Sequence, residues 1–331
     1  MFDRRKNDLV ACVGNACVDV YLTGLNHWPG RGERAVITNP KVSVGGNALN
    51  TAIVLSRLDV NSHLVASISD DYYGRFILER LARSGVHFDQ SLLLGTNGTD
   101  NPTAHALISV AEDGEPSFVY MPGTSSRLDA GMLERWIQDR GNGLRLLHLS
   151  SLGILPNFGG EDLGEVVERA KQHRPQLRVS VNTTLVHGHT SEDWQRALGP
   201  VLLFTDYLIP NLMEAQQILG NSQMPMGDGE HAVSAARRLR QMCGEATAVI
   251  ITMGKDGCAV VDRDDRAEII RVESSNVTDA TGAGDAWCAG FIAGLVGRDF
   301  ESVFDAARDG NRVARRCVAS ESAHDFDFHE D

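Results

Sequence analysis

The chain has 331 residues, of which 42% are apolar, so it can bury one large core or two modest ones. Its 31 Lys and Arg residues against 44 Asp and Glu residues leave a net charge of −13, and so acidic a surface repels nucleic acid and anionic membranes. Six cysteines without a C-x-x-C pair exclude a disulfide framework and a zinc site, and no apolar run approaches the ~18 residues that span a bilayer, so we expect a cytoplasmic protein.

Short apolar runs of strand length alternate along the chain with segments of helical periodicity. Strands are predicted at residues 9–13, 63–68, 144–149, 177–181, 207–209 and 248–252. Helices are predicted at residues 48–58, 74–84, 163–173, 211–219 and 231–242, with two more at 283–296 and 301–319. Such alternation favours an α/β fold with a mostly parallel central sheet between two helical layers. The acidic tail 320–331 is expected to fray.

Two segments, about 20–43 and 103–121, break this alternation with polar–apolar patterns and turn signals. The second is typical of a hairpin whose strands flank an acidic turn at 112–115. We interpret both segments as a small β layer added to the α/β body. Because no repeat, low-complexity tract or long linker divides the chain, we predict a single domain, 1–331, in which these segments form a lid.

The strongest local signal is a Gly-rich loop that enters a helix of small residues, Asp279-Ala280-Thr281-Gly282-Ala283-Gly284-Asp285. Residues without bulky side chains let backbone N–H groups approach a ligand closely, and a helix N-terminus favours an anion. Asp285 would be repelled by a phosphate beside it, so it either caps the helix or accepts a proton. The flanking glycines and the second acid, Asp279, favour the proton acceptor.

Weaker signals lie elsewhere, and each has an ordinary structural explanation. In Gly45-Gly46-Asn47-Ala48-Leu49-Asn50, two amides open a predicted helix, where they either bind hydroxyl groups or cap it. Asn211 and Glu214 match a capping box and acquire a function only beneath a metal–phosphate site. Asp19 follows the first strand, where an α/β sheet holds its ligands or where an Asp forms a turn. The segment with Thr252, Gly254 and Gly257 is a hairpin turn with a potential nucleotide contact.

Taken in this order, the motifs resemble the ribokinase-like (PfkB) family of carbohydrate kinases, over residues 9–323. The loop 279–285 is similar to the family signature D-T-x-G-A-G-D, with Ala280 in place of a Thr. Gly45, Gly46 and Asn50 match G-G-x-x-x-N. The stretch 70–74 is similar to the last part of G-D-D-x-x-G, and 211–214 is similar to N-x-x-E.

The resemblance implies an ATP-dependent sugar kinase that phosphorylates a hydroxymethyl group of a monosaccharide or sugar acid, with a three-layer α/β/α body and a small β-sheet lid. It implies that Asp285 is the general base and that the backbone of Gly282, Ala283 and Gly284 is the anion hole. The other implied roles are sugar binding by Asp19, Gly45, Gly46, Asn47 and Asn50, and nucleotide binding by Asn182, Thr252, Gly254, Gly257 and Asn311. Asn211 and Glu214 would hold Mg²⁺ through water, Asp279 and Thr281 would begin a monovalent-cation (K⁺) loop, and the lid would form a homodimer.

Two segments depart from the family pattern. The usual D-x-N-x-R is Ser180-Val181-Asn182-Thr183-Thr184, and the usual R-x-G-A is Ser320-Glu321-Ser322-Ala323, so the nucleotide contacts and the cation loop are less well supported than Asp285. Two alternatives stay open: a nucleoside kinase of the same family, and a sugar- or nucleotide-binding regulator without catalysis. A dinucleotide-dependent dehydrogenase is excluded because G-x-G-x-x-G is absent.

Overall fold

The structure is a computed structural model that describes residues 8–22, 24–25, 27–38, 40–95, 101–110, 116–220, 229–273, 277–320, 323–324 and 326. The predicted turn at 112–115 and most of the predicted frayed tail lie outside the described residues.

A nine-stranded sheet forms the centre of the α/β body. Its strands are β1 (Leu9–Val13), β4 (Asn61–Val65), β6 (His87–Phe88), β10 (Leu144–Leu152), β11 (Arg178–Thr183), β12 (Tyr207–Ile209), β13 (Ala248–Thr252), β14 (Cys258–Val261) and β15 (Ala267–Ile270). The order is β15-β14-β13-β12-β11-β10-β1-β4-β6, parallel except for the antiparallel β14 and β15. β1, β12 and β14 contain apolar residues alone, which is typical of strands covered by helices on both faces. A separate parallel pair joins β5 (Ile68–Ser69) to β7 (Leu93–Leu94).

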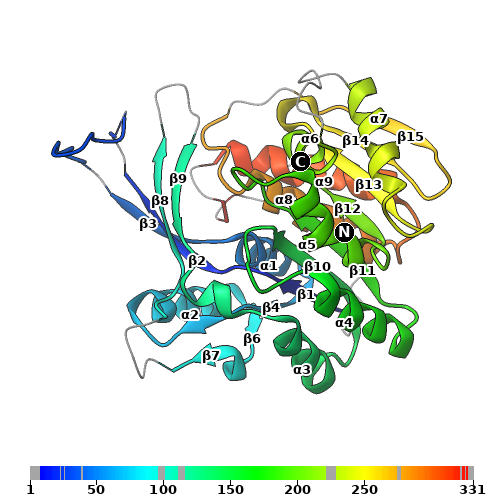
Figure 1. The fold of residues 1–331 in the computed structure, drawn as a ribbon, viewed down its shortest axis with the longest axis horizontal. Helices are drawn as coiled ribbons and strands as arrows, with labels where there is room; N and C mark the ends of the chain where they lie inside the picture. The colour runs from blue at the N-terminus through cyan, green and yellow to red at the C-terminus, as the bar shows by residue number, and fades with distance from the viewer. Residues whose placement is uncertain are drawn as a thin grey trace.

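Two helical layers enclose the sheet (Figure 1). One layer packs on the core that contains Leu147 and Val181, and it consists of α3 (Ala130–Arg140), α4 (Gly160–His173), α5 (Ser191–Leu202), α6 (Leu212–Ile218) and α7 (Gly229–Arg240). The other packs on the core that contains Leu146 and Ile250, and it consists of α1 (Asn47–Arg57), α2 (Tyr72–Ser84), α8 (Ala283–Gly297) and α9 (Val303–Val318). Three short 3₁₀ turns lie at Gln90–Leu92, Gly123–Arg127 and Gly254–Asp256.

A four-stranded sheet projects from one side of the body (Figure 1, left). It consists of β2 (Cys17–Tyr21), β3 (Lys41–Gly45), β8 (His105–Val110) and β9 (Pro116–Met121) in the order β3-β2-β8-β9, and we call it the small sheet. The predicted hairpin is confirmed by the antiparallel pairing of β8 and β9. The prediction for the segment 20–43 is only partly right. β2 and β3 lie at its two ends, and no strand occurs between them among the described residues.

Two helices, α3 and α5, were not predicted from the sequence. Local capping starts both: Asp129 accepts from the Met132 amide, and Thr190 forms a capping box with Asp193. Pro200 lies inside α5, which weakens its helical pattern. These helices are therefore fixed by their caps and by burial of their apolar faces.

The chain leaves the neighbouring strands β1 and β10 toward opposite helical layers. β1 leads through the small sheet to α1, whereas β10 leads to α4 on the other face. In open α/β sheets such a reversal leaves a crevice at the carboxyl ends of the strands, where ligands bind. The residues after Val13 and at the end of β10 therefore mark where a site is expected.

Candidate active site

Asp285 lies in the first turn of α8, which begins at Ala283. The N-cap is Gly282, with a φ of 77°, and no side chain caps the helix, so the capping explanation of Asp285 is wrong. Its side chain is turned into the protein and is only 7% exposed. A buried carboxylate needs specific partners, because an unpaired one pays a large desolvation cost.

Two amides from the start of α1 supply those partners. Asn47 Nδ2 donates to Asp285 Oδ1 at 3.0 Å, and Asn50 Nδ2 donates to Oδ2 at 2.7 Å. Burial raises the pKa of Asp285 to about 6, although both hydrogen bonds act to lower it. The group is therefore ionised at neutral pH and more basic than an ordinary Asp, which suits a proton acceptor.

The start of α1 is tied in turn to the crevice at the sheet reversal. Asn15 lies just after β1, and its Oδ1 accepts a hydrogen bond from the backbone N–H of Asn47 at 2.9 Å. Ser151 Oγ lies 2.6 Å from the same Asn15 oxygen and 3.1 Å from Asn47 Oδ1. Gly46 caps α1 with a φ of 98°, a conformation that favours glycine. The two-amide motif thus orients Asp285, and the predicted alternative of an Asn cap is wrong.

Asp19 does not end a central strand, as the sequence suggested; it lies within β2 of the small sheet. It pairs across to Ser43 in β3, and its carboxylate packs against Gly45 at the end of that strand. Burial raises the pKa of Asp19 to about 6, and the Cys17 thiol donates to it at 3.4 Å. The charge of Asp19 also acts to raise the pKa of Asp285.

The loop before α8 presents backbone N–H groups of the kind that bind anions. The first amides of a helix have no intrahelical acceptor, and an added Cβ at Gly284 would meet open space. Of the three residues in the predicted anion hole, Ala283 already uses its backbone N–H, which donates to Ala280 O at 3.2 Å. Asp279 accepts from the Thr281 amide at 2.8 Å, which closes the loop.

Glu214 is a buried carboxylate that closes a capping box at the start of α6. Asn211 is the N-cap, which confirms the ordinary structural explanation of this pair. Glu214 also accepts from Thr183 Oγ1 at 2.8 Å and from the Leu185 amide at 3.1 Å. Burial raises its pKa to about 7, with a contribution from the charge of Asp285.

The residues predicted to border a nucleotide fall into two groups. Thr252 ends β13, forms a bridge to Asn211 and begins the turn with Gly254 and Gly257 that leads into the antiparallel β14. Two amides are instead used within the fold. Asn182 Nδ2 donates to Ile209 O at 2.8 Å. Asn311 donates to Ile270 O at 3.1 Å and accepts from Trp287 Nε1 at 2.8 Å.

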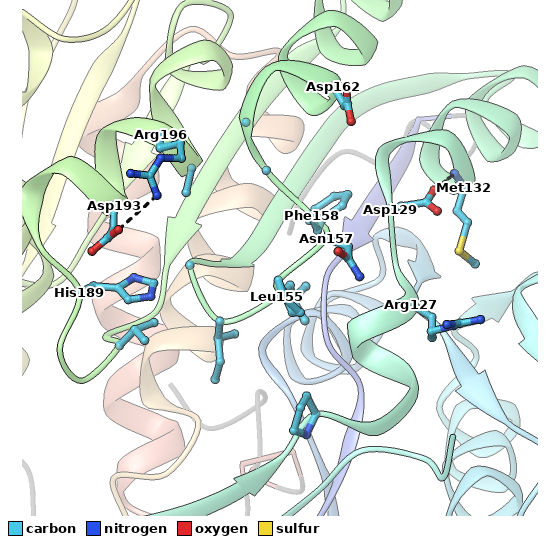
Figure 2. Close-up of a pocket in the computed structure, with 18 of the residues that line it drawn as sticks. Arg127, Asp129, Met132, Leu155, Asn157, Phe158, Asp162, His189, Asp193 and Arg196 are labelled. Atoms are coloured by element: carbon cyan, nitrogen blue, oxygen red, sulfur yellow. Dashed lines mark hydrogen bonds and ion pairs between the residues drawn. The ribbon is translucent and has the colours of Figure 1, made fainter. Parts of the chain in front are cut away.

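A cavity of about 1110 Å³ lies beside this constellation (Figure 2). Its lining includes Gly153, two residues after Ser151, together with Arg127 and His189, but no predicted site residue. Figure 2 shows side chains of both charge signs around it, with Asp193 and Arg196 joined as an ion pair. The convergent buried groups lie at Asp285, so the surroundings of Asp285, and not this cavity, form the candidate site.

Sequence reasoning missed Ser151, which links Asn15 to Asn47. It is a non-glycine residue with a φ of 62°, and strain of this kind concentrates at functional sites. Its only sequence signal is its place, a polar residue at the end of a buried apolar strand.

Direct metal ligation finds no support in the described part of the chain, where no three His, Cys, Asp or Glu side chains gather to hold an ion. Across the same described ranges, every helix is too short or too polar to cross a membrane.

Comparison with known proteins gives one consistent result. The model of the pfkB family of carbohydrate kinases matches residues 7–328. An uncharacterized sugar kinase of Archaeoglobus fulgidus is 29% identical over 276 residues, 82% of this chain and 96% of that protein. A nucleoside kinase of Methanocaldococcus jannaschii is 22% identical over 301 residues, 89% and 86% of the two chains. The ribokinase of Arabidopsis thaliana, solved with ribose and ATP, superposes with a TM-score of 0.75 at 21% identity over 96% and 94% of the chains.

Proposed function

The chain belongs to the pfkB family of carbohydrate kinases, and from this premise we propose that it transfers the γ-phosphoryl group of ATP to a hydroxymethyl group of a monosaccharide. The observation that carries the proposal is the Asp285 carboxylate, fixed by two amides in the first turn of α8. Phosphoryl transfer depends on positioning and electrostatic stabilisation more than on covalent chemistry by the protein. A helix start with a buried base beside it provides both.

Asp285 acts as the general base. Each carboxylate oxygen accepts one amide hydrogen bond and keeps a lone pair for the hydroxyl group of the acceptor. The hydroxyl donates its proton to Asp285 as its oxygen attacks phosphorus, and the bond to the ADP oxygen breaks. The amides hold the carboxylate still, so little reorganisation is needed during the step.

The loop from Gly282 to Gly284 forms the anion hole. Its backbone N–H groups and the dipole of α8 stabilise the charge that develops on the transferred group. The open space beside Gly284 lets a phosphoryl oxygen approach the backbone. The nucleotide lies along the turn that contains Thr252, Gly254 and Gly257.

The residues near Glu214 fit a magnesium ion held through water. A carboxylate whose pKa is raised to about 7 by burial is stabilised by a nearby cation. Glu214 and Asn211 would hold this ion, which when bound neutralises phosphate charge. Asp279 and Thr281 would hold a monovalent cation at the start of the loop before α8.

We propose that the acceptor sugar is bound under the small sheet, which forms the lid of a single domain. Asp19 binds it, together with the NH₂ hydrogens of Asn47 and Asn50 that do not donate to Asp285. Asp19 and Asp285 are both buried carboxylates on this side, and they favour an uncharged sugar over a sugar acid.

The small sheet is also the proposed dimer surface. Val42, Phe118 and Val119 are 47%, 57% and 52% exposed on its strands. In the register of the small sheet, Val42 and Val119 lie in one row on the same face, and Phe118 lies on the other face. Exposed apolar side chains in one row favour a protein partner, here a second copy of the chain. Light scattering should give the mass of a dimer, and Val119→Asp should convert it to a monomer; a wild-type monomer would contradict this surface.

A substrate panel with Mg·ATP and coupled detection of ADP, with and without K⁺, tests the proposed function. Turnover of neutral sugars is expected. Turnover of nucleosides alone would favour the nucleoside kinase. Thermal stabilisation by sugar or nucleotide, without release of ADP for any acceptor, would favour the non-catalytic binding protein.

A further inference from the structure

The C-terminal segment beyond α9 folds back onto the catalytic region. The sequence predicts a frayed tail, and for two of its residues this is wrong, because His324 and Phe326 are each only 3% exposed. Ala323 lies against Gly282, where an added Cβ would approach the Ala323 Cβ to 2.5 Å. The segment therefore contacts the N-cap of the helix that carries Asp285.

His324 contacts the amide that orients the catalytic base. Its Nε2 lies 2.6 Å from Asn50 Oδ1, while Asn50 Nδ2 donates to Asp285 Oδ2 at 2.7 Å. An ionised carboxylate only accepts hydrogen bonds, so Asn50 must present its NH₂ group to Asp285 and its oxygen to His324. That oxygen only accepts, so His324 must carry a hydrogen on Nε2.

The same helix anchors the segment a second time. Arg57 Nη2 donates to the Phe326 carbonyl at 2.7 Å, and its guanidinium lies 5.7 Å from the centre of the Phe326 ring. Arg57 follows Asn50 by seven residues, two helical turns, so both contacts lie on one face of α1. These two contacts fix the segment beside the active site.

We propose that His324 is a positioning residue, which fixes the Asn50 amide so that it holds Asp285 in the geometry for proton transfer. The C-terminal segment then completes the catalytic site. This inference rests on the proposed function of Asp285. A purely structural role predicts instead that His324 matters only for its volume.

Two substitutions of similar size separate these roles. His324→Phe keeps the volume and removes the donor, whereas His324→Gln keeps an N–H donor of similar reach. We expect His324→Phe to lower kcat about 10- to 100-fold with KM for ATP nearly unchanged, and His324→Gln to stay within about threefold of wild type. Equal losses in the two variants, or no loss in His324→Phe, would overturn the proposal. The matched control is His173→Ala, an exposed residue of α4.

A double-mutant cycle tests whether His324 acts through Asn50. The double variant Asn50→Ala/His324→Phe should have the same kcat as Asn50→Ala alone. Additive losses of kcat would show that His324 does not act through Asn50. Nitrogen NMR of the folded wild-type protein adds a readout that needs no variant: we expect the proton on Nε2 of His324, and an Nδ1–H tautomer would overturn the proposal. If Asp285→Asn is inactive and His324→Phe is not impaired, this inference alone fails; an active Asp285→Asn removes the proposed function itself.

Discussion

Replacing Asp285 by Asn removes the proposed base and leaves the backbone of the site almost unchanged. At pH 7.5 a group with a pKa of about 6 is about 97% ionised, so nearly all wild-type molecules carry the base form. Positioned general bases contribute about 10²- to 10⁴-fold to rates, and we expect kcat to fall by that factor. The NH₂ group of the new amide would also face one of the two donors, Asn47 Nδ2 or Asn50 Nδ2, and this lost hydrogen bond favours the upper part of the range.

The assay is steady-state release of ADP at pH 7.5 with the sugar that the panel identifies. KM for ATP should change little, because Asp285 does not bind the nucleotide in this account. Asp139→Asn makes the same change of charge at an exposed position of α3 and should keep full activity. A turnover of Asp285→Asn within about tenfold of wild type would refute the role of the base.

Three further predictions follow from particular contacts. Gly282→Ala should destabilise the fold by about 1–3 kcal/mol, because Gly282 has a φ of 77° and an added Cβ would lie 2.5 Å from Ala323 Cβ. The thermal midpoint of Gly282→Ala should lie below that of Gly284→Ala, and equal midpoints would contradict this. The raised pKa of Asp285 predicts that kcat/KM falls as pH drops through about 6, and a flat profile from pH 5 to about 8 would contradict it. The same shift, from 3.8 to about 6, means that the stability contributed by this group is fully present below pH 3.8 and is lost as the pH rises through about 6. Glu214→Gln, which preserves the capping box, should raise the Mg²⁺ concentration for half-maximal activity about tenfold or more, and an unchanged Mg²⁺ dependence would exclude Glu214 from the metal site.

The centre of the candidate site could be predicted from local sequence because its geometry is local. The loop 279–285 contains its glycines, its helix start and its carboxylate within seven residues, and the structure keeps them together. The amides of Asn47 and Asn50 were predicted on the sugar, and the structure shows them on Asp285, a contact across more than 230 positions. The residue type of these two side chains predicts hydrogen bonds, but only the packing of α1 against α8 decides which group they bond to.

The wrong predictions for Asp19 and for the C-terminal segment share a physical cause: both depend on contacts with residues far away in the sequence. Asp19 was placed at a central strand because nothing near it reveals that β2 pairs with β8 instead. The C-terminal segment was expected to fray because its composition is acidic, yet burial of Phe326 and the contact with Arg57 hold it down. Composition describes the isolated segment, whereas its order depends on the surface that receives it.

The most direct test of the central claim is a structure of the protein with a non-hydrolysable ATP analogue and the accepted sugar. We expect the acceptor hydroxyl within about 3 Å of an Asp285 carboxylate oxygen, with the terminal phosphate against the N–H groups of Gly282 and Gly284. A sugar whose hydroxyl groups all lie beyond hydrogen-bond reach of Asp285, with the carboxylate still held by its two amides, would contradict it.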